Sequence, residues 1–309
     1  MARRWKKMAI LAKVETTVGT DAVPTGAANA IQALDVTLTP LAGDEIQRDY
    51  MVPYLGNQGA LLVGNYNELQ FSVELSGSGT LGTPPALAPL LKACAFAEVI
   101  TAGASVAYNP ISSGFQAVSI YANLDGVNHV LLGARGTCTL NLAPKQIPRL
   151  QFNFKGLLGP IADVALPSVT LTSWLPAVPV SKANTPVWTL HGHSAIAESL
   201  SIDVGNTVTV RSLVNYEGIE ITDRSATGSM VIEAVAIGTK DWFSLARAGT
   251  TGALAITHGM VAGNIVDIAA PAVQIGRPTY GQTDAIINNT LPLMLRPASG
   301  NDELTLTFR

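Results

Sequence analysis

Alternating apolar and polar residues dominate the chain and predict half-buried β-strands. Every second residue of ELQFSVELS (68–76) is apolar, and between them lie polar residues that include Glu68, Gln70, Ser72 and Glu74. The same alternation recurs in RLQFNFKG (149–156), with Gln151 and Asn153, and in ELTLTFR (303–309), with Thr305 and Thr307. A period of two residues is typical of a strand with one buried face. We therefore expect a mainly β fold.

The order of these patterns occurs twice along the chain. Residues 33–80 and 198–239 both give a strand, a long polar loop and a second strand that ends in Gly-Thr, so that Glu74 falls on Glu233. A helix-like stretch follows in each half, at 85–99 and 240–252. Three or four strands then end each half, and in the alignment of the two halves Leu150 of the last strand corresponds to Leu304. This repeated order predicts an internal duplication.

The predicted duplication divides the chain into two tandem β-sandwich or barrel domains. Residues 1–165 form the first domain with its N-terminal arm, and residues 187–309 form a diverged second copy. Each domain carries one flanking α-helix and one long loop. The Pro-rich stretch 166–186 is the expected linker.

The two long loops, 41–65 and 206–228, are the best candidates for contact surfaces. Loops of this length are uncommon unless they carry function or are disordered. Aromatic, methionine and arginine side chains favour protein contacts. The candidate contact residues are Arg48, Tyr50, Met51, Tyr54, Tyr216 and Arg224.

The composition is consistent with a surface covered by neighbouring subunits. Apolar residues make up 48% of the 309 residues and charged residues only 13%, about half the usual charged fraction. A plain β-rich domain with many Ser, Thr, Asn and Gly residues would also have few charges. The net charge of −3 gives no general attraction to nucleic acid. The two cysteines favour a reducing compartment over a disulfide framework.

Residue patterns for catalysis are weak. Residues 77–82 match the glycine spacing of a dinucleotide-binding turn, but Pro84 and Pro85 delay the following helix and no βαβ alternation follows. His191 and His193 lack further metal ligands nearby in the sequence. We therefore predict a protein that is not an enzyme, with no cofactor and no bound metal. A nucleotide-binding enzyme that uses Gly77–Gly82 is the alternative from another class.

Four segments together resemble the tail tube, or major tail, proteins of phages with long non-contractile tails. They are ETTVGTDAVPTGAANAI (15–31), DVTLTPLAGDEIQRDYMVPYLGNQGALLVGN (35–65), ELQFSVELSGSGT (68–80) and PALAPLLKACAFAE (85–98). The resemblance covers roughly residues 10–160 and depends on segment order. It implies a β-sandwich with one flanking helix, whose sheets join into rings that stack as a hollow tube for DNA ejection.

The resemblance also implies partners and a location. The chain would contact copies of itself and the tape-measure, tail terminator and tail tip proteins, in a virion tail assembled in the host cytoplasm. Double-stranded DNA would pass without specific binding, and no membrane contact is expected. Because family members with one such domain usually form six-membered rings, the duplication suggests a ring of three chains. Alternatively, the ring holds six chains and the second half is an outward decoration domain.

The polar strand faces are candidates for the wall of the lumen. A channel that passes DNA should lack clusters of cations that would hold the phosphates. The lumen-facing candidates are Glu68, Gln70, Ser72, Glu74, Glu233, Gln151, Asn153, Thr305 and Thr307. The other interpretation places these faces against the flanking helix or on the outer rim.

Overall fold

The computed structural model describes residues 2–309, which form twenty strands and two short helices. The first half contains β1 (Met8–Val14), β2 (Ala30–Ile31), β3 (Leu34–Gln47), β4 (Ala60–Glu74), α1 (Ala88–Ala93), β5 (Phe96–Thr101), β6 (Ser105–Pro110), β7 (Val118–Leu124), β8 (Val127–Leu142) and β9 (Arg149–Asp163). The second half contains β10 (Val187–Leu190), β11 (His193–Ser194), β12 (Ala197–Asp203), β13 (Asn206–Leu213), β14 (Tyr216–Arg224), β15 (Thr227–Glu233), α2 (Trp242–Ala248), β16 (Thr251–His258), β17 (Val266–Ile275), β18 (Thr279–Thr283), β19 (Ile286–Arg296) and β20 (Thr305–Phe308). The prediction of a mainly β fold is confirmed, and neither helix within residues 2–309 is long and apolar enough to cross a membrane.

Six strands of each half are paired in the same spatial order. In the first half the antiparallel order is β1–β7–β8–β9–β4–β3. In the second half it is β10–β16–β17–β19–β15–β12. The helix comes after the same strand in each series, α1 after β4 and α2 after β15. Strands with the same place in the two series can therefore be compared directly.

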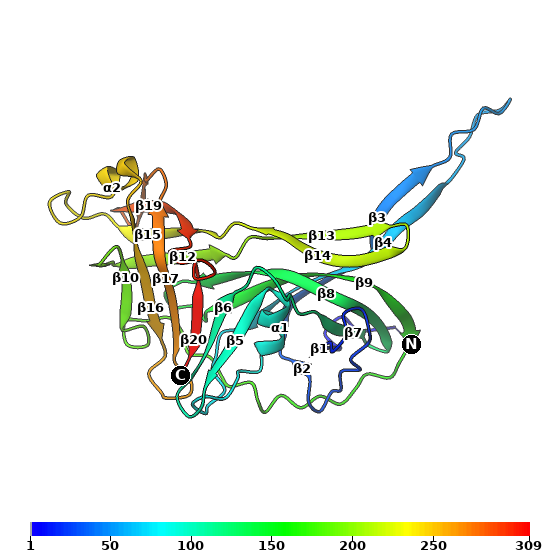
Figure 1. The fold of residues 1–309 in the computed structure, drawn as a ribbon, viewed down its shortest axis with the longest axis horizontal. Helices are drawn as coiled ribbons and strands as arrows, with labels where there is room; N and C mark the ends of the chain where they lie inside the picture. The colour runs from blue at the N-terminus through cyan, green and yellow to red at the C-terminus, as the bar shows by residue number, and fades with distance from the viewer. Residues whose placement is uncertain (1) are drawn as a thin grey trace.

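The two halves share one sheet through two junctions. β12 of the second half pairs with the end of β8, where Leu200 faces Leu142 and Asp203 faces Thr139. β20 of the second half pairs with β6 of the first and also with β17. Figure 1 shows the second half standing across one end of the curved β8–β9 sheet, with β20 beside β6. Through the β8–β12 junction, eight strands form one continuous series of neighbours, the eight-strand run β3–β4–β9–β8–β12–β15–β19–β18.

The core contains the residues that the alternation assigns to it. Phe71, Phe152 and Phe154 are fully buried, and their ring centroids lie 5.7–5.9 Å apart. The helix α2 also follows its sequence signals. The Asp241 side chain accepts a hydrogen bond from the Ser244 amide at 2.9 Å, and Gly249 ends the helix in a left-handed conformation at φ 65°.

Three segments differ from the expectation. The expected long loops are largely strands: β3 and β4 continue into 41–65, and β13 and β14 occupy most of 206–224. The C-terminal strand β20, set against β9 in the sequence, does not take the place of β9 in the second sheet, because β19 does. The alternation of a half-buried strand shows which face is buried but does not identify the neighbouring strand.

The Pro-rich stretch 166–186 packs along the first half without forming a strand or helix. The Trp174 indole nitrogen donates to the carbonyl oxygen of Ala30 at 2.9 Å. Val180 is buried and exchanges backbone hydrogen bonds with Lys145 and Gln146. The segment is thereby held against the surface of the first half.

Candidate functional site

The polar side chains of β4 and β9 lie on one face of the sheet. Facing residues of an antiparallel pair point to the same side, so each β4 residue shares a side with its β9 partner. The facing pairs are Glu68–Lys155, Gln70–Asn153, Ser72–Gln151 and Glu74–Arg149. The intervening Leu69, Phe71 and Val73 are fully buried on the other side. We call this surface and its continuation on neighbouring strands the polar face.

The polar face continues from the first half into the second. At the β8–β12 junction Thr139 faces Asp203 and Asn141 faces Ser201. Ser201 in turn faces Ser229 of β15. Glu233 is the last residue of β15, four positions after Ser229, so it lies on the same side. The structure thus brings Glu68, Gln70, Ser72, Glu74, Gln151, Asn153 and Glu233 onto one continuous face.

A concavity of about 800 Å³ marks the place where the two halves meet on this face. Its lining comes from both halves and mixes polar side chains with Leu142, Ala143, Ile147 and Leu200. The lining residues include Asp35, Ser72, Asn141, Arg149, Gln151, Ser199, Ser201 and Ser229. Arg149 and Asp35 form an exposed ion pair with Nη1 and Oδ2 3.1 Å apart. The concavity therefore combines hydroxyl, amide and charged groups with apolar side chains, and Arg149 is the one cation among its described lining residues.

Thr305 and Thr307 lie on a different part of the molecule. Their strand, β20, pairs with β6 and β17 and is not part of the eight-strand run. The Thr305 hydroxyl donates to Oδ1 of Asn109 on β6 at 2.9 Å. The structure does not bring these two threonines together with the candidates on β4 and β9.

The outer part of the β3–β4 hairpin, residues 41–65, projects from the body and is called the arm (Figure 1). Arg48, Tyr50, Met51 and Tyr54 lie at or near its tip and are exposed. The exposed fraction is 60% for Tyr50, 101% for Met51 and 67% for Tyr54. Large apolar side chains with this exposure form a surface suited to another protein.

The β13–β14 hairpin of the second half, called the docked hairpin, lies along β8 and β9 on the side opposite α1 (Figure 1). The nearly buried Arg135 of β8 donates to the Ile219 carbonyl oxygen and to Oε2 of Glu220, both at 2.6 Å. Lys155 donates to the Val208 carbonyl oxygen at 3.3 Å. The hairpin therefore covers part of the polar face near Lys155.

Tyr216 lies at the tip of the docked hairpin and is 43% exposed. Its hydroxyl donates to the Glu220 carboxylate, and this hydrogen bond raises the pKa of Tyr216. The guanidinium of Arg211 lies 5.8 Å from the Tyr216 ring centroid, a distance compatible with a cation–π contact. Tyr216 is thus exposed at a tip, as Tyr50 and Tyr54 are in the arm.

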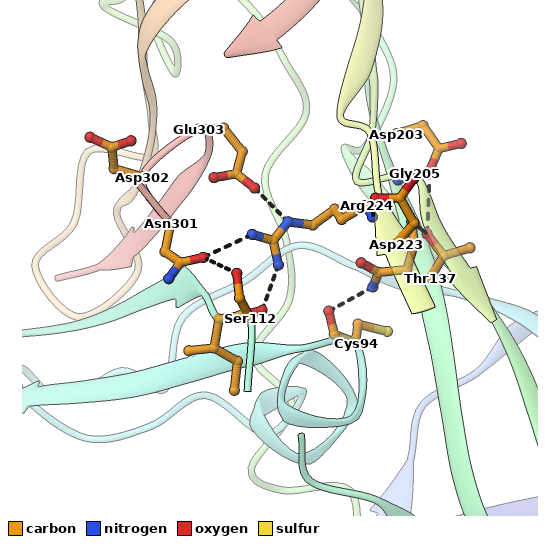
Figure 2. A network of polar contacts seen from close by, with 12 residues as sticks. Cys94, Ser112, Thr137, Asp203, Gly205, Asp223, Arg224, Asn301, Asp302 and Glu303 are labelled. Carbon is orange, nitrogen blue, oxygen red and sulfur yellow. Dashed lines mark hydrogen bonds and ion pairs between the residues drawn. The ribbon is translucent and has the colours of Figure 1, made fainter. Parts of the chain in front are cut away.

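Arg224, at the base of the docked hairpin, is held within the chain (Figure 2). Its Nε donates to the Glu303 carboxylate, its Nη1 to the Ile111 carbonyl oxygen at 2.6 Å, and its Nη2 to Oδ1 of Asn301 at 3.2 Å. The Arg224 and Glu303 side chains are only 12% and 8% exposed. Arg224 therefore joins β14 to the turn before β20 and to the first half, and does not project like the tip residues.

Sequence reasoning missed Arg135 and Asn206, which also hold the docked hairpin. Asn206 is buried, and its side-chain amide donates to the carbonyl oxygens of Cys94 at 2.9 Å and Gly136 at 3.1 Å. A lone arginine in the apolar stretch LLGARGTCTL (131–140) was the available signal for Arg135, because a buried cation requires partners.

The glycine-rich turn 77–82 packs against the second half. The Gly77 amide donates to Oδ1 of Asn264 at 2.7 Å, and the Gly79 amide donates to the Gly263 carbonyl oxygen at 2.9 Å. A β-carbon on Gly77 would lie 2.1 Å from that Gly263 oxygen. Glycine is thus required at Gly77 for close backbone packing, and these two amides are already hydrogen-bonded.

His191 and His193 lie at the turn between β10 and β11 and contact the same tryptophan. Their rings meet Trp242 of α2 edge-on, with centroid distances of 6.5 and 5.8 Å. His191 Nε2 lies 2.7 Å from the Val273 carbonyl oxygen. Burial lowers the pKa of His191, which favours its neutral form. Both rings pack around α2.

Comparison with known proteins assigns the chain to a family. A search of curated proteins finds no match. The sequence model of the phage tail tube protein family matches residues 5–308, which include both series of strands and both junctions. The resemblance noted for the first half thus extends over nearly the whole chain, and the chain belongs to the phage tail tube protein family.

Proposed function

We propose that this tail tube protein assembles into rings of three copies that stack into the hollow tube through which phage DNA is ejected. The observation that carries the proposal is the repeated order of six strands, with the two sheets joined edge to edge at β8–β12. A chain with two such units presents the same surface twice. Three chains would then supply the six lobes of a pseudo-hexameric ring.

The domain division follows the same argument. Residues 1–165 are the first tube domain, 187–309 are the second, and 166–186 are the linker held against the first. In the alternative, six copies form the ring and the second half is an outward decoration domain. The equal strand order and the continuity of the polar face across β8–β12 favour the duplicated tube domain.

We assign the polar face to the wall of the lumen. Its candidates from β4, β9 and β15 lie on one side of a continuous sheet, and Glu74 and Glu233 end corresponding strands. In a ring of three copies these two residues would give six carboxylates around the channel, which would repel DNA phosphates weakly and prevent tight binding. Thr305 and Thr307, on β20, would lie farther from this wall.

The tips of the arm and of the docked hairpin are the proposed contacts between stacked rings. Tyr50, Met51 and Tyr54 project from one, and Tyr216 from the other. Arg48 lies at the base of the arm tip, whereas Arg224 would hold the docked hairpin in position. Tape-measure, terminator and tail tip proteins are the further partners that membership in the family suggests. Assembly would occur in the host cytoplasm, and the finished tube would belong to the virion tail.

The rotational order of assembled rings tests this function. The purified chain, concentrated until it assembles, is imaged by electron cryo-microscopy. Three chains with six similar lobes around a channel are expected. Six chains with an outer knob would retain a tube but reject the duplicated ring. A chain that stays monomeric at all concentrations would contradict self-assembly.

A charge reversal tests the lumen assignment. In Glu74→Lys/Glu233→Lys, rings and tubes should form normally, but DNA ejection should slow several-fold because the new ammonium groups hold phosphates. The control, Ala102→Lys/Ser299→Lys, also adds two lysines per chain, on exposed turns outside the polar face, the arm and the docked hairpin. Ejection kinetics of phage assembled with each variant are measured. Equal rates for both variants would contradict the assignment.

A further inference from the structure

The two ends of the eight-strand run are unequal edges. β3 lies at one end and pairs with β4, and β18 lies at the other end and pairs with β19. Within residues 2–309 the paired residues give neither strand a partner on its other side. Unpaired strand edges are templates for pairing with another chain.

The internal junction shows what the β18 edge corresponds to. Gln151 of β9 faces both Ser72 of β4 and Thr139 of β8. In the second half, Thr290 of β19 likewise faces Val231 of β15 and Thr279 of β18. Thr279 in the second sheet therefore corresponds to Thr139 in the first sheet. The β8 segment from Thr139 to Leu142 is covered by β12, whereas every residue of β18 is exposed.

The β3 edge corresponds to β12 in the same way. Thr37 faces Gln70 of β4, and Ser201 faces Ser229 of β15. Each strand also has an irregularity on the N-terminal side of this pair, directly before Thr37 in β3 and two residues before Ser201, between Ala197 and Ser199, in β12. Since β3 corresponds to β12 and β18 corresponds to the end of β8, β3 would pair with β18 as β12 pairs with β8.

Burial differs as expected between the covered and uncovered strands. Leu200 and Ile202 of β12 are 1% and 0% exposed. Val36 and Leu38, which have the same places in β3, are only partly buried. On the other edge, Tyr280 has the place of the buried Leu140 but is 66% exposed. A strand on each edge would remove this apolar surface from water.

We propose that β3 of one copy pairs antiparallel with β18 of the next copy in the register of the internal β8–β12 junction. The facing pairs are Val36–Gln282, Thr37–Gly281, Leu38–Tyr280 and Thr39–Thr279. This inference rests on the proposed ring and names the strands that close it. The polar threonines then continue the polar face, and Leu38 joins Tyr280 and Phe243, whose rings are 5.3 Å apart, on the apolar side.

Two prolines fit the end of this pairing. In the internal junction the Val204 amide donates to the Cys138 carbonyl oxygen at 3.1 Å. The corresponding residues are Pro40 and Pro278, so this hydrogen bond is absent between copies. Proline is tolerated on edge strands and at strand ends. The pairing therefore stops after Thr39 and Thr279.

The arm supplies a second, independent argument. It connects β3 to β4 as the docked hairpin, with its flanking turns, connects β12 to β15. Ile219 and Ile221 of the docked hairpin are 1% and 7% exposed, because that hairpin lies on β8 and β9. In the arm Leu61 and Leu62 are 47% and 51% exposed. When β3 pairs with β18, the arm would lie across the neighbouring copy's second sheet and bury these leucines.

A disulfide test uses the pair Thr39→Cys and Thr279→Cys in one full-length chain. The Val204–Cys138 hydrogen bond makes the adjacent Asp203–Thr139 a non-hydrogen-bonded pair, whose α-carbons lie about 4.5 Å apart. That separation suits a disulfide. Thr39 and Thr279 are exposed and lie on strands at opposite ends of the run, so the bond forms between copies. The native Cys94 and Cys138 are buried.

Oxidised rings of this variant should give covalent dimers and trimers on a non-reducing gel, with trimer as the largest main product, and reduction should return monomer. In the control Thr39→Cys/Thr283→Cys, the second cysteine is shifted by about 13 Å along β18, and at least tenfold less cross-linked product is expected. Equal cross-linking in both variants would overturn the register.

Imaging of the unmodified chain separates this inference from the proposed function. If rings form but Thr39→Cys/Thr279→Cys gives no cross-link, the β3–β18 pairing is wrong and the tube function stands. If the unmodified chain forms no rings at any concentration, both the ring and the pairing are rejected.

Discussion

The arm and the docked hairpin are two β-hairpins at corresponding places in the chain, in different surroundings. The docked hairpin lies on β8 and β9, and Arg135, Asn206 and Arg224 fix it there. The arm projects from the body, with Leu61 and Leu62 about half exposed (Figure 1). The difference is that the preceding half of the same chain provides a surface for the docked hairpin. In the proposed ring, the equivalent surface for the arm comes from another copy.

The largest expected effect comes from releasing the base of the docked hairpin with Arg224→Ala. Without the guanidinium, Glu303 becomes a nearly buried carboxylate without its ion pair, and the Ile111 carbonyl loses a donor. We expect the free energy of unfolding to fall by about 3–5 kcal/mol. Urea denaturation of the isolated chain measures it. The exposed Arg296→Ala serves as the control, and a loss below about 1 kcal/mol for Arg224→Ala would show that the hairpin is held mainly by other contacts.

Truncating one apolar side chain in each hairpin compares them directly. Ile221→Ala removes a buried side chain and should cost about 2–4 kcal/mol of unfolding free energy. Leu62→Ala removes a side chain that is 51% exposed and should change it by less than about 0.5 kcal/mol in the isolated chain. Urea denaturation again gives both values. A similar loss for the two variants would mean that the arm is already packed in the monomer.

A third comparison concerns two glycines, Gly77 in the turn that packs against the second half and Gly56 in the arm. Gly77→Ala places a β-carbon 2.1 Å from the Gly263 carbonyl oxygen, so the two halves must separate locally. Overpacking of this kind should cost about 1–3 kcal/mol. Gly56→Ala in the arm meets nothing within 4 Å and should be neutral. Thermal unfolding of both variants gives the result, and a neutral Gly77→Ala would contradict the close contact.

The smallest expected effect is the pH dependence of the free energy of unfolding that comes from His258, which contacts the linker. His258 is buried, with Nδ1 2.9 Å from the Thr185 hydroxyl and Nε2 3.1 Å from the Val178 carbonyl oxygen, and burial lowers its pKa. The unfolded chain therefore binds the proton first as pH falls. Stability from this residue is complete above the ordinary histidine pKa of about 6.5 and is lost as pH falls below it, by at most about 1.4 kcal/mol per pH unit.

The measurement is the free energy of unfolding between pH 7.5 and 5 for the native chain and His258→Gln. The variant should show a shallower loss on acidification. Some loss should remain, because burial also lowers the pKa values of His129 and His191. Parallel curves for the two proteins would show that His258 can accept a proton in the folded state without cost.

The sequence was sufficient to predict which face of each strand is buried, but it was not sufficient to predict which strands pair with each other. Alternation identifies Leu69, Phe71 and Val73 as core, and all three are fully buried. The same period is weaker within residues 41–65 because the arm is exposed on both faces, so the sequence pattern there predicts a loop. The contacts of Arg135 and Arg224 join segments about 80–110 residues apart. No local pattern encodes such partners, since they arise only when the two sheets join.

The β8–β12 junction also determines the angle between the two sheets of one chain. The β3 and β18 edges differ, so copies joined through them would form a heterologous, head-to-tail series. Such a series closes into a ring only if the rotation per copy divides a full circle, and otherwise it continues as an open helix. In the proposed ring, the angle between the two sheets within one chain would therefore contribute to the curvature of the tube before any second copy arrives. A change at Leu200 or Leu142 could alter tube diameter while leaving both open edges intact.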